Sequence, residues 1–218
     1  MKAIVCTKYG PPNVLQLEDV EKPTPKDTEV LIRVHATTVT AGDCGLRGLK
    51  FPLLLQPLVR IGFGFRGQRE KILGQELAGE ITAVGKEVTR LRRGNQILAW
   101  TGLSLGAYAQ YTCLPETGVL VTKPSNITYE EAAALAVGGL DAVYLLRRAT
   151  IQNGDKVLIH GSGGTIGTFA IQLARYFGAH VTAVDSTEKL GSARASLRQT
   201  RSLITREKFS RKAVKPMM

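Results

Sequence analysis

The first 125 residues alternate short apolar, β-branched runs with glycine- and proline-rich breaks. These runs are Lys2–Lys8, Val14–Val20, Glu29–Val39, Ala78–Val84, Gln96–Trp100 and Ala107–Leu114. Gly-Pro-Pro-Asn and Pro-Thr-Pro-Lys-Asp separate the first three runs, and glycines bound the others. Several short strands with turn signals between them are typical of a barrel or a rolled sheet. We therefore predict a β-rich domain over residues 1–125.

The pattern changes after residue 125. Thr128 and Glu131 have the spacing of a capping box, in which Thr128 is the N-cap of a helix. We predict an alanine-rich helix from there to about Arg148. The short apolar run Lys156–His160 then suits a strand covered on both faces in a parallel sheet.

A strand, a glycine-rich turn, a helix and a second strand follow one another from residue 156 onward. The predicted helix runs from Thr168 to Phe177 and ends at Gly178, and the second strand, His180–Val184, ends at Asp185. This order is one βαβ unit. We therefore predict an incomplete nucleotide-binding domain over residues 126–197.

The glycines of this turn have the spacing Gly161-x-x-Gly164-x-x-Gly167. Without side chains, the backbone amides come close to a pyrophosphate, and the helix N-terminus adds free N–H donors and a partial positive charge. The position between strand and helix distinguishes the motif from an ordinary tight turn. The candidate cofactor-binding residues are Gly161, Ser162, Gly163, Gly164, Thr165, Ile166 and Gly167.

The residues after the second strand give conflicting signals about the cofactor. Asp185 is placed to accept hydrogen bonds from the adenosine ribose hydroxyls, which favours NAD(H). Ser186, Thr187 and Lys189 follow it and are suited to a 2′-phosphate, which favours NADP(H). Ser186 and Thr187 are equally well explained as a helix N-cap. The cofactor is therefore NADP(H) or NAD(H).

Charge and composition narrow the class of protein. The net charge is +11, but residues 191–218 hold eight Lys or Arg against one Glu, so the other 190 residues carry only +4. A nucleic-acid-binding function rests on this tail alone and is not favoured. No apolar stretch approaches the roughly 20 residues of a membrane span, and the N-terminus has no signal-peptide pattern. We expect a cytoplasmic protein.

Cysteine and histidine usage gives no metal or disulfide pattern. Cys6, Cys44 and Cys113 are odd in number and far apart, and no two stand at the spacing of a zinc site. The three histidines are also scattered along the chain. For each of these residues, a packed or surface position is the favoured interpretation.

Residues 1–197 resemble the medium-chain dehydrogenase/reductase superfamily. The runs that carry the resemblance include ILGQELAGEITAVGKEVTRLRRGNQI and KVLIHGSGGTIGTFAIQLARYFGAHVTAVDSTEKL. The resemblance implies an α/β plus β fold: an N-terminal GroES-like β-rich barrel followed by an incomplete Rossmann βαβ unit. It also implies a homodimer for the full-length form of the family.

Two positions at which the chain differs from zinc-containing members of this superfamily indicate whether it binds a metal ion. Zinc-containing members carry a cysteine where this chain has Thr40, and a histidine where it has Gln75. Without the thiolate and the imidazole, a tetrahedral catalytic zinc has too few ligands. The chain thus resembles the zinc-free quinone-reductase branch, and we predict no metal site. Cys44 as a displaced ligand is the less favoured alternative.

That branch implies a small-molecule substrate, namely a quinone, an enone or an aldehyde-like carbonyl. The nicotinamide supplies the hydride, and the protein supplies orientation and a hydrogen bond to the substrate oxygen. Thr40 matches a position that is often Asn, so it is the candidate catalytic donor, although a structural threonine is the favoured alternative. Asp43 is interpreted as a turn or capping residue. Phe51–Phe65 is either a wall for an apolar substrate or an irregular buried loop.

The tail, residues 198–218, departs from the family pattern, in which the Rossmann domain continues. With chosen codons, reading Gln199 to Arg206 one nucleotide earlier gives ADEVIDYT, which resembles the family's next segment. We hypothesise a frameshift near Arg198 and an unselected basic tail, loose beyond about residue 190.

The alternative function is an inactive remnant that retains the GroES-like fold. We expect only one following neighbour for the strand Lys156–His160, and apolar surface left exposed.

Overall fold

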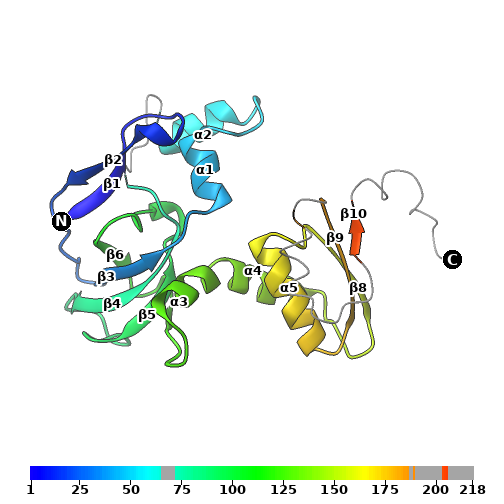
Figure 1. The fold of residues 1–218 in the computed structure, drawn as a ribbon. Coiled ribbons are helices and arrows are strands. Elements are labelled where there is room, and N and C mark those ends of the chain that lie inside the picture. The colour runs from blue at the N-terminus through cyan, green and yellow to red at the C-terminus, as the bar shows by residue number, and fades with distance from the viewer. Residues whose placement is uncertain (65–71, 187–188, 190–202, 206–218) are drawn as a thin grey trace. The chain divides into compact units, whose positions relative to one another are not determined.

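The computed structural model describes residues 1–64, 72–186, 189 and 203–205, and it divides into two compact units (Figure 1). Unit 1 is Met1–Ala136 and unit 2 is Val137–Met218. The strands of unit 1 are β1 (Lys2–Cys6), β2 (Leu15–Asp19), β3 (Glu29–Thr37), β4 (Glu76–Val84), β5 (Gln96–Trp100), β6 (Tyr111–Pro115) and β7 (Val119–Thr122). Its α-helices are α1 (Ala41–Arg47), α2 (Gln56–Phe63) and α3 (Tyr129–Leu135), with 3₁₀ turns η1 (Pro12–Val14) and η2 (Gly102–Ser104).

Unit 1 is built on a five-stranded antiparallel sheet of order β6-β3-β4-β5-β7, with β1 and β2 paired as a separate hairpin. Alternating side chains of the central strands bury one face of this sheet. The resulting core contains Val30, Ile32, Leu77, Ile81, Ile97, Ala99, Ala107 and Leu114. The predicted β-rich domain is confirmed. Strand β7 was not predicted, because its four residues are mostly exposed and show no buried alternation.

Helix α3 belongs to unit 1 rather than to the nucleotide-binding part. Its residues Ala132 and Ala133, with Ala136 after it, pack against Ala78 of β4 and Leu98 of β5. Small side chains let the helix lie close to the sheet. The division between the two compact units therefore comes after Ala136, later in the chain than the predicted boundary at residue 125.

The capping box at Thr128 and Glu131 is present, with each side chain accepting from the other residue's amide. The predicted single helix to Arg148 is wrong, because α3 ends at Leu135 and α4 (Gly138–Arg148) begins separately. The break coincides with Gly138. A Cβ there would lie 2.4 Å from Thr165 Cγ2, so this glycine lets α4 pack closely on the next helix.

Unit 2 contains the predicted βαβ unit. After α4 come β8 (Lys156–His160), α5 (Thr165–Tyr176), β9 (His180–Asp185) and β10 (Leu203–Thr205). The strands form a parallel sheet of order β10-β9-β8. Helix α5 starts three residues before the predicted Thr168, because Gly164 has the extended conformation of an N-cap.

The structure corrects one expectation for this sheet and adds a strand to it. Strand β8 is not covered on both faces by the described residues: Val157 and Ile159 pack against the core around α5, whereas Leu158 is 53% exposed. This exposure agrees with the expected uncovered apolar surface. Strand β10, a third strand that was not expected, pairs with β9 within the tail, so β8 keeps β9 as its one neighbour among the described strands, as expected. The rest of residues 198–218 lies outside the described residues.

Within the described ranges, no helix is both long and apolar enough to cross a membrane.

Candidate functional site

The first half of the glycine turn is held by its own hydrogen bonds. Gly161, which has φ +79°, and Ser162 both donate their amides to the carbonyl of Val184, at 2.9 and 3.2 Å. The Gly163 amide donates to Asp185 Oδ2 at 2.7 Å, and the Gly164 amide donates to the Gly161 carbonyl at 3.1 Å. The first three of these amides tie the turn to the end of β9, and the fourth closes the turn on itself.

The next three amides, those of Thr165, Ile166 and Gly167, have no acceptor among the described residues. They form the first turn of α5, where the N–H groups of a helix lack an internal partner. No side chain caps this turn and no acidic residue lies in it. Free amides, the positive end of the helix dipole and a first helical turn without an acidic residue together make a binding site for an anion, next to the Asp185 carboxylate that occupies the Gly163 amide.

The space around these amides depends on two glycines that serve different purposes. A Cβ at Gly164 would meet only the Gly161 carbonyl, at 3.4 Å, and would otherwise point into open space. A Cβ at Gly167 would lie 2.2 Å from the same carbonyl and 2.7 Å from Ser162 Cα. Gly164 therefore keeps the anion site open, and Gly167 lets the helix approach the turn. The residues present fit a pyrophosphate.

Ser162 is a candidate residue that the structure places inside the protein. Its side chain is fully buried, and its hydroxyl has no hydrogen-bond partner among the described residues. It lies beneath the turn, so its side chain does not face a phosphate bound from solvent.

Asp185, Ser186 and Lys189 lie together beside the turn. Asp185 accepts from the amides of Gly163 and Ser186, and the Gly163 bond is the main cause of a carboxyl pKa below the ordinary value of 3.8. The carboxylate is therefore charged at neutral pH. The Lys189 backbone packs so closely over Gly163 that a Cβ there would lie 2.6 Å from the Lys189 carbonyl. Thr187 lies outside the described residues.

Thr40, the candidate catalytic residue of unit 1, is the N-cap of α1. Its side chain accepts from the Asp43 amide at 3.0 Å and donates its hydroxyl to Asp43 Oδ2 at 2.6 Å. Asp43 is only 2% exposed, and its other oxygen accepts from the Gly74 amide at 3.3 Å. The capping role predicted for Asp43 is confirmed. The single proton of the Thr40 hydroxyl is thus held by a buried carboxylate.

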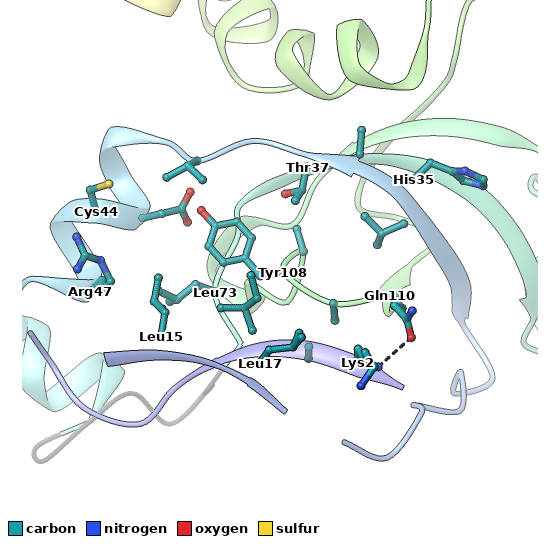
Figure 2. A pocket seen from close by; sticks show the side chains of 18 residues that line it. Lys2, Leu15, Leu17, His35, Thr37, Cys44, Arg47, Leu73, Tyr108 and Gln110 are labelled. Carbon is teal, nitrogen blue, oxygen red and sulfur yellow. Dashed lines mark hydrogen bonds between the residues drawn. The ribbon is translucent and has the colours of Figure 1, made fainter. Parts of the chain in front are cut away.

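Asp43 also borders an apolar pocket of about 380 Å³ within unit 1. Leu15, Leu17 and Leu73 form part of its lining, with Tyr108 in the middle (Figure 2). The Tyr108 hydroxyl is buried next to the Asp43 carboxylate, and no described residue meets it with the distance and angles of a regular hydrogen bond. Burial raises the pKa of this phenol far above its ordinary value, and the charge of Asp43 raises it further. No sequence pattern singled out Tyr108.

Thr40 and Gln75, the two positions at which the resemblance implies zinc ligands in zinc-containing proteins, lie side by side here. Gln75 Oε1 is 3.4 Å from Thr40 Oγ1. A hydroxyl and an amide are weak ligands for zinc compared with a thiolate and an imidazole. Among the residues that the structure describes, no three His, Cys, Asp or Glu side chains are grouped to hold a metal ion.

Comparison with known proteins agrees with this arrangement. Residues 26–125 match the family model of the alcohol dehydrogenase GroES-like domain. The chain carries a GroES-like domain. It is similar to a quinone oxidoreductase of Pseudomonas aeruginosa, with 36% identity over 195 residues that make up 88% of this chain and 55% of that protein. The predicted relation to quinone oxidoreductases of the medium-chain dehydrogenase/reductase superfamily is confirmed.

Solved structures give the same result. A quinone oxidoreductase from Coxiella burnetii superposes with a TM-score of 0.81 and 28% identity, covering 96% of this chain and 63% of that one. The Escherichia coli quinone oxidoreductase in complex with NADPH superposes with a TM-score of 0.77 and 25% identity, covering 94% and 58%. The chain thus spans little more than half the length of these relatives.

Thr40, the N-cap of helix α1, gives a first prediction. Thr40→Ala should lower the free energy of unfolding by about 1 kcal/mol, because it removes the cap of α1 and one hydrogen bond to the buried Asp43. Thr40→Ser keeps the hydroxyl and should unfold like the wild type. Urea titration followed by circular dichroism measures both. Equal midpoints for the alanine variant and the wild type would contradict the capping role.

The buried phenol gives a second prediction. Tyr108→Phe should change the free energy of unfolding by no more than about 1 kcal/mol, because the hydroxyl it removes is desolvated and interacts only weakly with the Asp43 carboxylate. The control is Tyr111→Phe in β6, which changes a half-buried ring beside Lys22 and should have little effect. A clear loss of stability in Tyr108→Phe would show that the hydroxyl has a partner in solution.

Proposed function

We propose that this protein is an NAD(P)H-dependent oxidoreductase that transfers hydride to a quinone or to an activated carbonyl or alkene. The observation that supports this most is the row of three unpaired amides at the start of α5, in an uncapped turn free of acidic residues. The names of the related quinone oxidoreductases support the reaction class. The NADPH in the E. coli structure supports the cofactor.

In this proposal the amides of Thr165, Ile166 and Gly167 bind the pyrophosphate of the cofactor. When bound, the nicotinamide supplies the hydride. The charged Asp185 accepts hydrogen bonds from ribose hydroxyls, which favours NADH, whereas the Lys189 ammonium attracts a 2′-phosphate, which favours NADPH. Thr40 serves by holding α1 and Asp43 in place, because its own proton is donated to that carboxylate.

The experiment that tests the reaction follows the absorbance of NADPH or NADH with the purified 218-residue chain and a water-soluble quinone. Oxidation that requires both protein and quinone supports the proposal. Cofactor binding without oxidation would favour the inactive remnant.

A third prediction concerns metal. The purified chain should contain no stoichiometric zinc, and chelators should leave any activity unchanged, because the Thr40 hydroxyl is committed to Asp43 and the neighbouring Gln75 offers only an amide. Elemental analysis measures the zinc content. One tightly bound zinc per chain would contradict the prediction. Cys44→Ser is the matched variant, since Cys44 is the alternative ligand, and it should leave the metal content unchanged.

We further propose that the protein acts in the cytoplasm on small molecules, without nucleic acid. The cysteines Cys6, Cys44 and Cys113 are all free, which suits a reducing compartment. The homodimer expected for the full-length family form stays a prediction.

A further inference from the structure

The segment around α2 exposes a row of large aliphatic side chains. Leu54, Leu58 and Ile61 follow one another at helical spacing and are 90%, 66% and 58% exposed, and Leu53 beside them is 83% exposed. These four residues are called the leucine stripe. The sequence left two interpretations open for this segment, a substrate wall or a buried loop, and the second is wrong. Leaving this much contiguous apolar surface in water is unfavourable.

The other side of α2 is firmly attached to unit 1, which fixes the stripe on the outside. Val59 and Phe63 pack against the core cluster that includes Leu46 and Leu73. At the end of the helix the Tyr9 hydroxyl donates to the Gly64 carbonyl at 2.9 Å. Because the inner face is already packed, the stripe is available to a partner of this folded unit. Figure 1 shows α2 at the periphery of unit 1, next to α1.

The charged residues in the stretch of sequence that contains the stripe are all basic. Residues 44–64 contain Arg47, Lys50 and Arg60 and neither Asp nor Glu; of these, Arg47 is buried and donates to the Gly10 carbonyl, and Arg60 lies half-buried over the Tyr9 ring. Lys50 is exposed just before the stripe, and the exposed Lys8 precedes Tyr9, whose hydroxyl contacts the end of α2. An apolar helix face flanked by basic side chains is the pattern of a segment that lies in the interface of an anionic bilayer.

We propose that the leucine stripe docks onto an anionic lipid surface. The four aliphatic side chains enter the boundary between headgroups and acyl chains, and Lys8 and Lys50 face the phosphates. A second copy of this chain would also cover the leucines, but a two-fold interface would bring the same basic residues together and gain nothing from their charge. The docking is peripheral, and it does not depend on the proposed hydride transfer.

The test is co-sedimentation of the full chain with vesicles of phosphatidylcholine containing phosphatidylglycerol. The wild type should bind these vesicles, bind pure phosphatidylcholine much more weakly, and dissociate as salt is raised. The double variant Leu54→Glu/Leu58→Glu should bind about tenfold or more weakly, because two charges would enter the interface. The control Leu17→Glu changes a leucine of matched exposure, 67%, in β2 outside the stripe, and should bind like the wild type.

A second variant, which changes only charged residues, tests the proposal even if the leucine variant misfolds. Lys8→Glu/Lys50→Glu alters only exposed side chains and should abolish the preference for phosphatidylglycerol with an unchanged circular dichroism spectrum. Three results would overturn the proposal: no vesicle binding by the wild type, equal losses in Leu17→Glu, or a dimer in sedimentation velocity that the leucine variant dissociates. Cofactor titration of the same samples is independent of lipid, so failure of this inference is distinguishable from failure of the proposed function.

Discussion

Replacing Gly164 by valine is expected to weaken binding of NADH and NADPH by roughly a hundredfold or more, because the side chain would occupy the space of the pyrophosphate. A Cβ at this position meets nothing in the protein except the Gly161 carbonyl at 3.4 Å, and the backbone is extended at φ −83°. The chain itself therefore tolerates a β-branched residue there. Fluorescence titration of the reduced nicotinamide measures the loss.

The graded control for this variant is Gly164→Ala. Its single methyl group reaches less far into the site, so its affinity should lie between those of the wild type and the valine variant. Circular dichroism should show the same helix content in all three proteins. Unchanged affinity in Gly164→Val would mean that the cofactor does not lie over this turn.

The second large effect is expected at Gly167, where a substitution should destabilise the fold of unit 2. Gly167→Ala should destabilise unit 2 by about 3 kcal/mol, because the new methyl group would lie 2.2 Å from the Gly161 carbonyl and 2.7 Å from Ser162 Cα. Both contacts are backbone atoms, so no side chain rotation relieves them. Cofactor binding should be lost with the structure of the turn.

Hydrogen exchange of the α5 amides measures this effect where it occurs. Exchange in Gly167→Ala should be much faster than in the wild type, while the amides of β3 and β4 in unit 1 keep their protection. Gly164→Ala is again the matched control, since it adds the same methyl group three residues earlier without a close contact. Wild-type protection in Gly167→Ala would show that the close approach of α5 to the turn is wrong.

The strands of unit 1 and the βαβ unit were predictable because their signals are local. Alternating apolar residues, glycine breaks and the capping box at Thr128 each act over a few positions. The break between α3 and α4 was not predictable in this way, since no local signal marks it, and the close packing of Gly138 on Thr165 beside it involves a residue far along the chain. Likewise, the outward face of α2 depends on which of its two apolar sides the core takes, and both sides are apolar in sequence.

The candidate site was predicted in its residues but not in their roles. The sequence marked Gly161 to Gly167 as one phosphate-binding turn. The structure divides them, because the Gly163 amide is taken by Asp185, twenty-two residues away in sequence, and only the amides from Thr165 onward are free. The same limit applies to Tyr108, whose buried hydroxyl follows from the packing of β1, β2 and α1 around it rather than from any motif.

The most direct test of the central claim is calorimetric titration of the full chain with NADPH and with NADH. The free amides of α5 predict saturable binding of one cofactor per chain with a dissociation constant of roughly micromolar order, and loss of that binding in Gly164→Val. The absence of saturable binding up to about millimolar cofactor, or equal binding by the wild type and Gly164→Val, would contradict it.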